Sequence, residues 1–206
     1  MRSLTLNNTF ATTHKLVDKT VGFLRLDQMT GEDWQLIQDY SEELATSSAD
    51  RALKMLESLK GIKPICPIDR YEHSLQTATR AYKDGADEEM IVVALLHDAG
   101  DAVAPKNHAE VIAAVLRPFI CENSYWLLKH HTLFQGYYYH QFCGRDPNER
   151  DKYRDHPAYQ ITVDFCERWD QLAFDPAYEN LPLSFFEPMV RRVFARKPFQ
   201  PSAWKI

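Results

Sequence analysis

Apolar residues recur at helical spacing along most of the chain, whereas the alternation typical of strands is nearly absent. The run Met90–Leu96 is continuously apolar and predicts a buried helix, which Asp87 caps and Gly100 ends. Glycine and proline residues separate the other periodic stretches. We expect helices over residues 32–59 (as one or two helices), 67–84, 87–97, 107–116, 122–134, 157–174 and 183–195. The pattern therefore predicts an all-α fold, a helical bundle.

Two segments lack this periodicity. Residues 1–31 are rich in Thr and β-branched positions and indicate an irregular or short-strand lead-in. Residues 137–156 (YYYHQFCGRDPNERDKYRDH) predict a long aromatic and charged loop with at most one helical turn. A loop of that length inside a compact domain is usually functional. Its first residues, Tyr137–His140, either cover a site as a lid or form an aromatic packing surface.

The composition is that of a globular protein, with 45% hydrophobic and 26% charged residues. We expect a single domain over residues 1–206, with an N-terminal extension and helices (1–66), a core (67–180) and a C-terminal helix (181–206). The net charge of −5 provides no basic surface, so we expect neither nucleic acid nor membrane as a partner. No signal pattern and no long apolar run is evident, which predicts a cytoplasmic protein.

The pair His97-Asp98 carries the strongest chemical signal, because it ends the apolar run. A carboxylate there faces the negative end of the helix dipole and an apolar wall, and both disfavour its charge unless a cation lies beside it. His97 shares a stripe with Met90 and Val93, so it points toward the core. A hydrogen-bonded core histidine is the alternative for His97 alone, but the neighbouring buried acid also needs a partner. Bound metal is the simplest cause.

Four further residues can complete a metal site. Imidazole nitrogen and carboxylate oxygen without thiolate suit iron, manganese or zinc, and a carboxylate can bridge two ions. The four cysteines are scattered along the chain, do not form the close pairs of a thiolate site, and are expected to be free thiols. The candidate metal ligands are His73, His97, Asp98, His108, His131 and Asp170.

The residues alone leave several of these assignments open. His73 lies on the polar side of its helix and faces either solvent or a polar pocket. His108, near a helix start, can equally be a surface or capping residue. His130 and His131 lie about 100° apart, so at most one is expected to be a ligand, and helical phase does not choose between them. Asp164 is as plausible a late acid as Asp170.

The motifs YEHSLQTATRAYKDGAD (71–87), ALLHDAGD (94–101), NHAE (107–110), KHHTLFQGYYY (129–139) and FCERWDQLAFDP (165–176) together resemble the HD-domain superfamily, which is named for its His-Asp pair. The order His, His-Asp, His, His, Asp, with gaps of 24, 11, 23 and 39 residues, is similar to its two-metal branch. The similarity covers roughly residues 67–180. It implies the HD-domain helical bundle.

Within that superfamily the chain is most similar to the mixed-valent di-iron oxygenases. This resemblance implies two iron ions (Fe²⁺/Fe³⁺), or Mn²⁺ or another divalent metal in their place, together with O₂ and a small-molecule substrate. It also favours His131 over His130 and Asp170 over Asp164. By the same resemblance, one iron is held by His73, His97 and Asp170, and the other by His108 and His131, with Asp98 bridging them. Contacts to the substrate or to the ligands are implied for Asp101, Asn107, His130 and Gln135.

The chain departs from the phosphonate-cleaving members of that group where they bind substrate. Asp101 and Gln135 stand at positions where those enzymes carry basic residues, and Lys63 and Cys66 stand in place of their tyrosine and glutamate. An acid makes a phosphonate or phosphate dianion a poor ligand. We therefore expect a small polar substrate that carries several hydroxyls or an amine, unless Asp101 is only a helix-end acid.

Three functions are consistent with these candidate residues. The first is a di-iron oxygenase that oxidatively cleaves a small hydroxylated substrate. The second is a metal-dependent phosphohydrolase acting on a nucleotide or other phosphoester, for which the cations available are Lys106, Lys129, Arg145, Arg150 and Arg154. The third is a binding or scaffold protein without chemistry, which the presence of all six ligand types disfavours.

Overall fold

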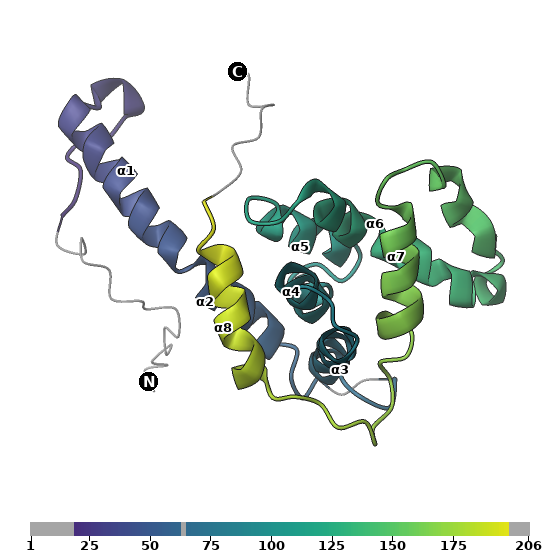
Figure 1. Cartoon of the computed structure of the whole chain (residues 1–206). Coiled ribbons are helices and arrows are strands. Elements are labelled where there is room, and N and C mark those ends of the chain that lie inside the picture. The colour runs from purple at the N-terminus through teal and green to yellow at the C-terminus, as the bar shows by residue number, and fades with distance from the viewer. Residues whose placement is uncertain (1–18, 63–64, 198–206) are drawn as a thin grey trace, which may run out of the picture. The chain divides into compact units, whose positions relative to one another are not determined.

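Helices form all the regular structure in the residues that the computed structural model describes, which are 19–62 and 65–197 (Figure 1). These residues fall into two compact units, divided after Ser48. The first unit contains a 3-10 turn, Leu26–Gln28, and the helix α1, Gly31–Thr46. Thr30 begins α1 with a reciprocal cap: its hydroxyl accepts from the amide of Asp33, whose carboxylate accepts from the amide of Thr30.

The second unit contains the other helices and all of the predicted chemistry. Its α-helices are α2 (Ser48–Glu57), α3 (Arg70–Lys83), α4 (Glu88–Leu96), α5 (His108–Leu116), α6 (Glu122–Tyr139), α7 (Tyr159–Phe165) and α8 (Leu183–Phe194). Short 3-10 segments span Ala99–Ala102, His140–Cys143 and Pro147–Tyr153, and a π-helical turn spans Cys166–Asp170. The predicted all-α bundle is confirmed.

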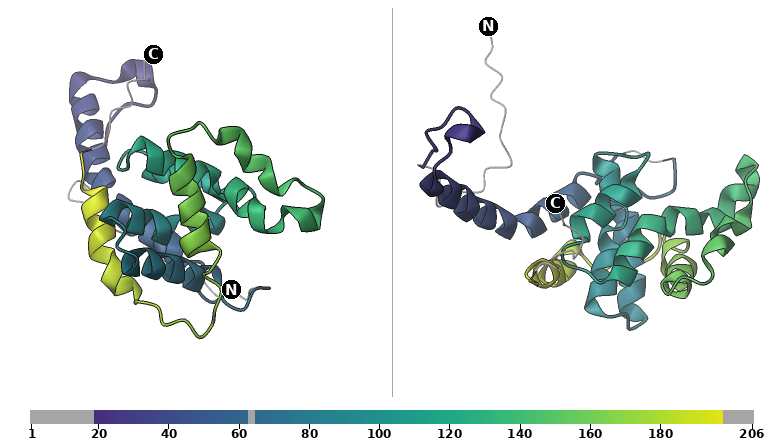
Figure 2. Two further views of the ribbon diagram at one scale, coloured as in Figure 1. Left: turned by 45° about the vertical axis from the view of Figure 1, so that its right-hand side comes forward. Right: turned by 90° about the horizontal axis from the view of Figure 1, so that it is seen from above.

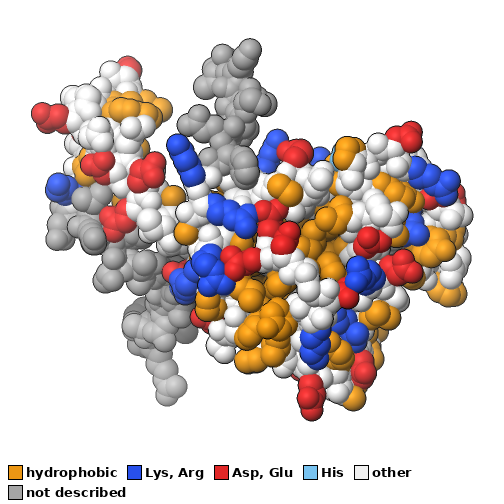
Figure 3. All heavy atoms as spheres, viewed as in Figure 1, with side chains coloured by type: hydrophobic (Ala, Val, Ile, Leu, Met, Phe, Trp, Pro, Cys, Tyr) orange, Lys and Arg blue, Asp and Glu red, His pale blue; other side chains and the backbone are white. Residues whose placement is uncertain are grey.

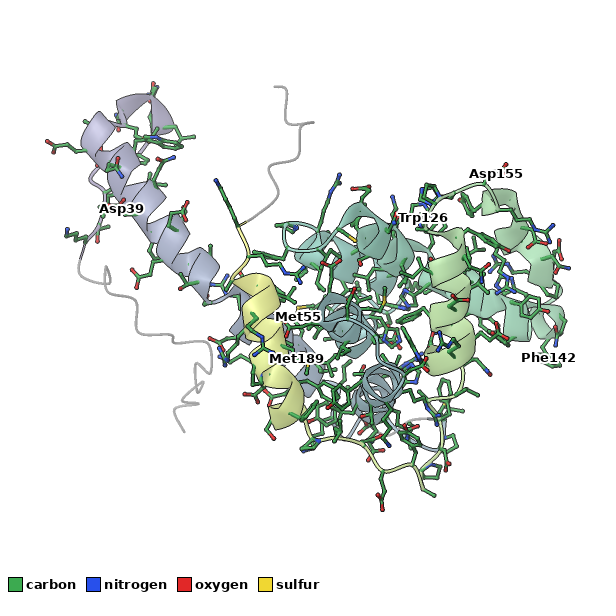
Figure 4. The ribbon with its side chains drawn as sticks, in the orientation of Figure 1. Asp39, Met55, Trp126, Phe142, Asp155 and Met189 are labelled. Atoms are coloured by element: carbon green, nitrogen blue, oxygen red, sulfur yellow. The ribbon has the colours of Figure 1, made fainter. Side chains whose placement is uncertain are left out.

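The helix α4 is the centre of this unit. Every residue from Met90 to Leu96 is buried, and α4 contacts α3, α6 and α8 (Figures 1 and 2). At the edge of the core, Met55 of α2 and Met189 of α8 pack against it (Figure 4). The continuous apolar run is therefore explained, because a helix surrounded on all sides has no solvent face on which polar residues are tolerated.

Capping residues determine where the helices that carry the site begin. Asp69 accepts a hydrogen bond from the amide of Glu72 at 2.8 Å, and Asp87 accepts one from the amide of Met90 at 2.8 Å. The helix expected over residues 67–84 therefore begins at Arg70 rather than at Pro67, whereas the predicted Asp87 cap is confirmed. Gly85, with a φ of 78°, follows the end of α3.

The prediction that a helix ends near Gly136 and that residues 137–156 form a loop is wrong. The helix α6 continues to Tyr139, and most of the segment after it is 3-10 helical. Gly136 lies inside α6 because the buried ring of His140 occupies the space that a Cβ would need. The expected helix over 157–174 is also shorter, since α7 passes into the π-helical turn at Cys166.

The remaining fold expectations concern the termini and the surface. Residues 1–18 of the predicted lead-in lie outside the described residues, and residues 19–30 contain no strand. Among the described helices, none combines the length and apolar character that spanning a bilayer requires. Acidic and basic side chains are interspersed on the face of the second unit in Figure 3. Two of the ion pairs between partly exposed side chains of this unit are Arg192–Glu88 and Arg191–Asp50.

Candidate metal centre

Six side chains from five elements converge beside the C-terminal end of α4. They come from α3, from the residues that follow α4, from the first residue of α5, from α6 and from the last residue of the π-helical turn. Five of them are at most 1% exposed, and the sixth, His108, is 14% exposed. The structure thus brings together the whole predicted set: His73, His97, Asp98, His108, His131 and Asp170.

The first half of the cluster contains two imidazoles and one carboxylate. Nε2 of His73 lies 3.2 Å from Nε2 of His97 and 3.1 Å from Oδ1 of Asp170. Nε2 of His97 lies 3.6 Å from the same oxygen. Asp170 Oδ1 is buried and accepts no hydrogen bond within the described residues. A buried carboxylate oxygen without a donor is costly unless a cation lies against it.

The second half repeats this combination. Nε2 of His108 lies 3.4 Å from Nε2 of His131, and Oδ1 of Asp98 lies 3.2 Å from the first and 3.4 Å from the second. The other oxygen of Asp98, Oδ2, faces the first half at 3.6 Å from both His73 and His97. Asp98 therefore offers one oxygen to each half, so its carboxylate could bridge two ions.

Hydrogen bonds to carbonyl oxygens fix the protonation of three of these imidazoles. Nδ1 of His73 lies 2.9 Å from the carbonyl of Ala173, that of His97 2.8 Å from Ala94, and that of His131 2.7 Å from Leu128; the three acceptors are main-chain oxygens. A carbonyl oxygen only accepts, so each Nδ1 carries the proton and, in the neutral ring, each Nε2 is left with a lone pair.

The lone pairs of these rings point at one another and at carboxylate oxygens. Such an arrangement is repulsive unless positive charge lies between the atoms. Fixing Nδ1 as the donor is also the usual way in which proteins prepare Nε2 to bind a metal. The nitrogen and oxygen donor set, the converging lone pairs and the unsatisfied Asp170 oxygen all fit a cation, so the cluster can hold metal ions.

The electrostatics of the metal-free cluster agree with this requirement. Burial alone would raise the pKa of Asp98, but the imidazoles of His97, His108 and His131 hold it well below its usual value. Burial likewise opposes ionisation of Asp170, yet His73 and His97 keep its pKa low. Both carboxylates are thus ionised although both are buried.

The imidazole of His108 responds in the opposite direction. Burial would lower its pKa, but the carboxylates of Asp101 and Asp98 raise it to about 10. The pKa of His97 is also raised, because Asp98 and Asp170 outweigh its burial. Without a metal, protons on imidazoles therefore supply the positive charge that the carboxylates need.

Two backbone features bring distant ligands to α4. A Cβ at Gly100 would lie 2.9 Å from the Cα of His108 and closer still to its carbonyl oxygen, so only glycine lets the turn after Asp98 pack directly on the start of α5. The π-helical turn places Asp170 at its last position, and such turns are frequent at functional sites.

Three side chains hold the cluster from outside. Gln135 donates from Nε2 to Oδ2 of Asp170 at 2.6 Å. Asp101 lies with Oδ1 3.0 Å from Nδ1 of His108 and with Oδ2 3.2 Å from Nε of Arg70. Arg70 also donates from a terminal nitrogen to Oδ2 of Asp98 at 2.9 Å. Gln135 and Asp101 were expected near the ligands, whereas Arg70 was missed, although its position one helical turn before His73 is a usable signal.

Two other residues expected to contact the ligands or the substrate form no side-chain hydrogen bond to the cluster among the described residues. Asn107 is exposed at the start of α5, and no hydrogen bond from its side chain to the cluster occurs among the described residues. His130 donates to the carbonyl of Trp126 at 2.8 Å and stacks on the Trp126 ring at 4.1 Å, on a different side of α6 from His131. Trp126, labelled in Figure 4, also stacks on His156 at 4.1 Å. The expected contact of His130 with the site is thus not seen, because adjacent helical residues diverge by about 100°.

Asp164, the rival late acid, is partly exposed and accepts a hydrogen bond from Gln160 at 2.7 Å on the surface of α7. A cavity of about 440 Å³ adjoins the cluster, with Arg70, His73 and Asp101 among its lining residues. A substrate of small-molecule size therefore has access to one side of the cluster.

Comparison with known proteins agrees with the geometry. The family model described as "HD domain" matches residues 70–171, which begin at the first residue of α3 and include all six clustered side chains. No curated protein matches the chain. Members of the HD family are generally metal-dependent enzymes, of the hydrolase type or related to it, and the His/Asp cluster is consistent with that chemistry. The His-Asp pair at the end of α4 is thus the namesake pair of an HD domain, which this chain contains over residues 70–171.

Proposed function

We propose that this protein is a di-iron oxygenase, which uses O₂ to cleave a C–C or C–heteroatom bond in a small hydroxylated substrate. One observation carries the proposal: each half of the cluster consists of two imidazoles and one carboxylate. That ligand combination, with coordination positions left open, is typical of non-haem iron oxygenases. Asp98 completes the second half and also faces the first, so two ions would share it.

The residues of the chain divide the work as follows. His73, His97 and Asp170 would hold one ion, His108 and His131 the other, and Asp98 both. Bound iron supplies the redox chemistry that side chains cannot perform. The protein orients the imidazoles through their Nδ1 hydrogen bonds and holds the carboxylates through Gln135 and Arg70. Burial of the ligands excludes bulk water, which protects reactive oxygen chemistry from side reactions.

The charges around the adjoining cavity favour oxygenase over phosphohydrolase. Among its described lining residues, Arg70 is the one cationic side chain, and it is already paired with Asp98 and Asp101. None of the five basic residues considered from the sequence lines the cavity. A phosphate would therefore find no unpaired cationic side chain among the described lining residues, and the metals alone would have to balance its charge.

The test measures metal content and O₂ chemistry in the full chain. Protein loaded anaerobically with Fe²⁺ should contain two irons per chain and, after partial oxidation, give the electron paramagnetic resonance signal of a coupled Fe²⁺/Fe³⁺ pair. Amino alcohols or polyols should then stimulate O₂ consumption. Asp98→Asn should lose the coupled signal, whereas the control Asp164→Asn should keep it. Hydrolysis of phosphoesters with Mn²⁺, independent of O₂, would instead establish a phosphohydrolase.

A further inference from the structure

The cavity beside the metal centre has a mostly apolar wall. Its volume is about 440 Å³, and it lies between the end of α2, the start of α3 and the segment that follows the π-helical turn. Six apolar side chains form the wall: Leu59, Ile62, Ile65, Ile68, Pro105 and Phe174. A polyol, which carries a hydroxyl on each carbon, would leave most of its hydroxyls without hydrogen-bond partners against such a wall.

The apolar wall begins directly at the candidate metal ligands. The ring of Phe174 packs on that of His73 with 4.6 Å between centroids. Arg70 and Asp101 also line the cavity, and both contact side chains of the cluster. If the head group of a ligand reaches the metals, the rest of the ligand would therefore contact the apolar side chains of the wall.

The polar groups of the cavity disfavour a negatively charged head. Asp69 already accepts hydrogen bonds from the amides of Gly61 at 2.7 Å and Glu72 at 2.8 Å. Arg70 is held between Asp98 and Asp101. Two lining acids and one paired arginine leave the wall with a net negative charge, which suits a neutral or cationic head.

The rim of the cavity is apolar as well. Ile62 is 59% exposed and Ile65 is fully exposed, although both line the cavity. Exposed apolar side chains gathered at a pocket are unfavourable in a free protein and typically mark a binding site. Apolar side chains thus occur in the described lining both at the rim and beside His73.

We infer that the substrate is an aliphatic alcohol, with a neutral or amine-bearing head at the metals and a hydrocarbon chain in this cavity. Contact of the head group with the metals rests on the proposed function, whereas binding of the hydrocarbon chain rests on the cavity alone. The inference narrows the expected class of small hydroxylated substrates to amphiphilic ones, of which 2-amino-1-alkanols are the simplest probes.

Cys66 allows binding to be measured without turnover. It lines the cavity and is exposed, whereas Cys121 and Cys143 are exposed elsewhere in the chain. Alkylation of each cysteine in the full chain is followed by peptide mass spectrometry in the presence of 2-amino-1-alkanols of two to eight carbons. Protection should be confined to Cys66, and the concentration for half protection should fall about fourfold with each added methylene.

Two matched variants test the location. Ile62→Asn changes an exposed residue of the cavity rim and should flatten the dependence on chain length. Leu172→Asn changes a residue of similar character, 44% exposed and outside this cavity, and should preserve the dependence. Both substitutions lie on the surface, so both variants are expected to fold.

The outcomes separate this inference from the proposed function. Protection that is independent of chain length, or that is as strong with a linear polyol or an alkyl phosphate of equal carbon number, would overturn the inference. Protection that depends on alkyl chain length, without O₂ consumption by the iron-loaded protein, would support binding of the hydrocarbon chain in the cavity and refute the oxygenase. O₂ consumption with short polyols and no protection of Cys66 would support the oxygenase and refute binding of a hydrocarbon chain in the cavity.

Discussion

Nδ1 of His108 lies 3.0 Å from Oδ1 of Asp101, and the carbonyl of Pro105 lies farther away, at 3.3 Å. The other three imidazoles of the cluster are oriented by main-chain carbonyl oxygens. His108 is therefore the one ring in the described cluster whose nearest Nδ1 partner is a charged side chain. Since Asp101 also binds Arg70, one substitution can disturb both partners.

Asp101→Asn should weaken metal binding in the second half of the cluster. An amide is a weaker acceptor than a carboxylate for the Nδ1 proton, and loss of such an outer partner typically lowers metal affinity 10- to 100-fold. Titration with Mn²⁺, measured by isothermal calorimetry, should show the larger loss of affinity for one of the two ions, because Asp101 reaches the other half only through Arg70 and Asp98. Asn107→Ala, an exposed neighbour without a bond to the cluster in the described structure, is the control. Equal weakening of both ions would contradict a role specific to His108.

The neighbours His130 and His131 should respond oppositely to alanine. His131→Ala removes a buried Nε2 of the second half and should abolish binding of that ion. His130→Ala leaves the cluster intact but removes the stacking on Trp126, which should cost about 1 kcal/mol of unfolding free energy. Metal stoichiometry and urea denaturation measure the two effects. Loss of an ion in His130→Ala would show that the ligand has been assigned to the wrong histidine.

Gly100→Ala should both destabilise the fold and displace His108. The added Cβ would collide with the backbone of His108, which cannot move without shifting the start of α5. Overpacking of this kind typically costs about 1–3 kcal/mol. Denaturation midpoints and the affinity for added divalent metal should both fall. At Gly31, a Cβ would meet no atom within 4 Å, so Gly31→Ala is the control; similar losses in both variants would contradict the argument.

Glu89 should make the fold sensitive to acid. Burial would raise its pKa, but hydrogen bonds from the Ser124 hydroxyl, the Cys121 amide and Arg196 lower it below its usual value of 4.5. The folded pKa thus lies below the unfolded one. The stabilisation is present in full above about pH 4.5 and is lost as pH falls through the folded pKa.

The measurement compares wild type with Glu89→Gln across pH. At neutral pH the variant should be less stable by about 1–2 kcal/mol, because it loses hydrogen bonds to a charged acceptor. The difference should shrink below about pH 4.5. Glu122→Gln, at the exposed start of α6, removes a carboxylate without touching this network. A difference between wild type and Glu89→Gln that stays constant down to pH 3 would refute the prediction.

Much of the fold and of the cluster could be predicted from the sequence. The apolar run before His97 identified the central helix, since hydrophobic period and burial are local properties. The polar side on which His73 lies faces the buried cluster, as the resemblance implied. The six residues lie together in space, while their role as ligands of iron stays a prediction. Choosing His131 over His130 required the resemblance to the known family. The two residues differ only in the direction in which they leave the helix, and the sequence alone does not show which direction faces the cluster.

The remaining features depend on tertiary contacts that no local pattern encodes. The helix expected to end at Phe134 continues past Gly136, where the ring of His140 fills the space that a Cβ would need. The π-helical turn that aims Asp170 has no sequence signature. The position of Arg70 one helical turn before His73 could indicate that it lies near the cluster, but not its contacts with Asp98 and Asp101, which are 28 and 31 residues away. The apolar cavity joins segments as distant as Leu59 and Phe174, so it exists only in the folded chain.

The attachment of His97 and Asp98 to a helix that is buried at every position from Met90 to Leu96 has a dynamic consequence. Amide hydrogens in such a helix exchange with solvent only when the whole core opens. The two halves of the cluster share Asp98, so opening of that helix would disturb both. Disruption of both halves at once would then accompany cooperative unfolding rather than loop motion.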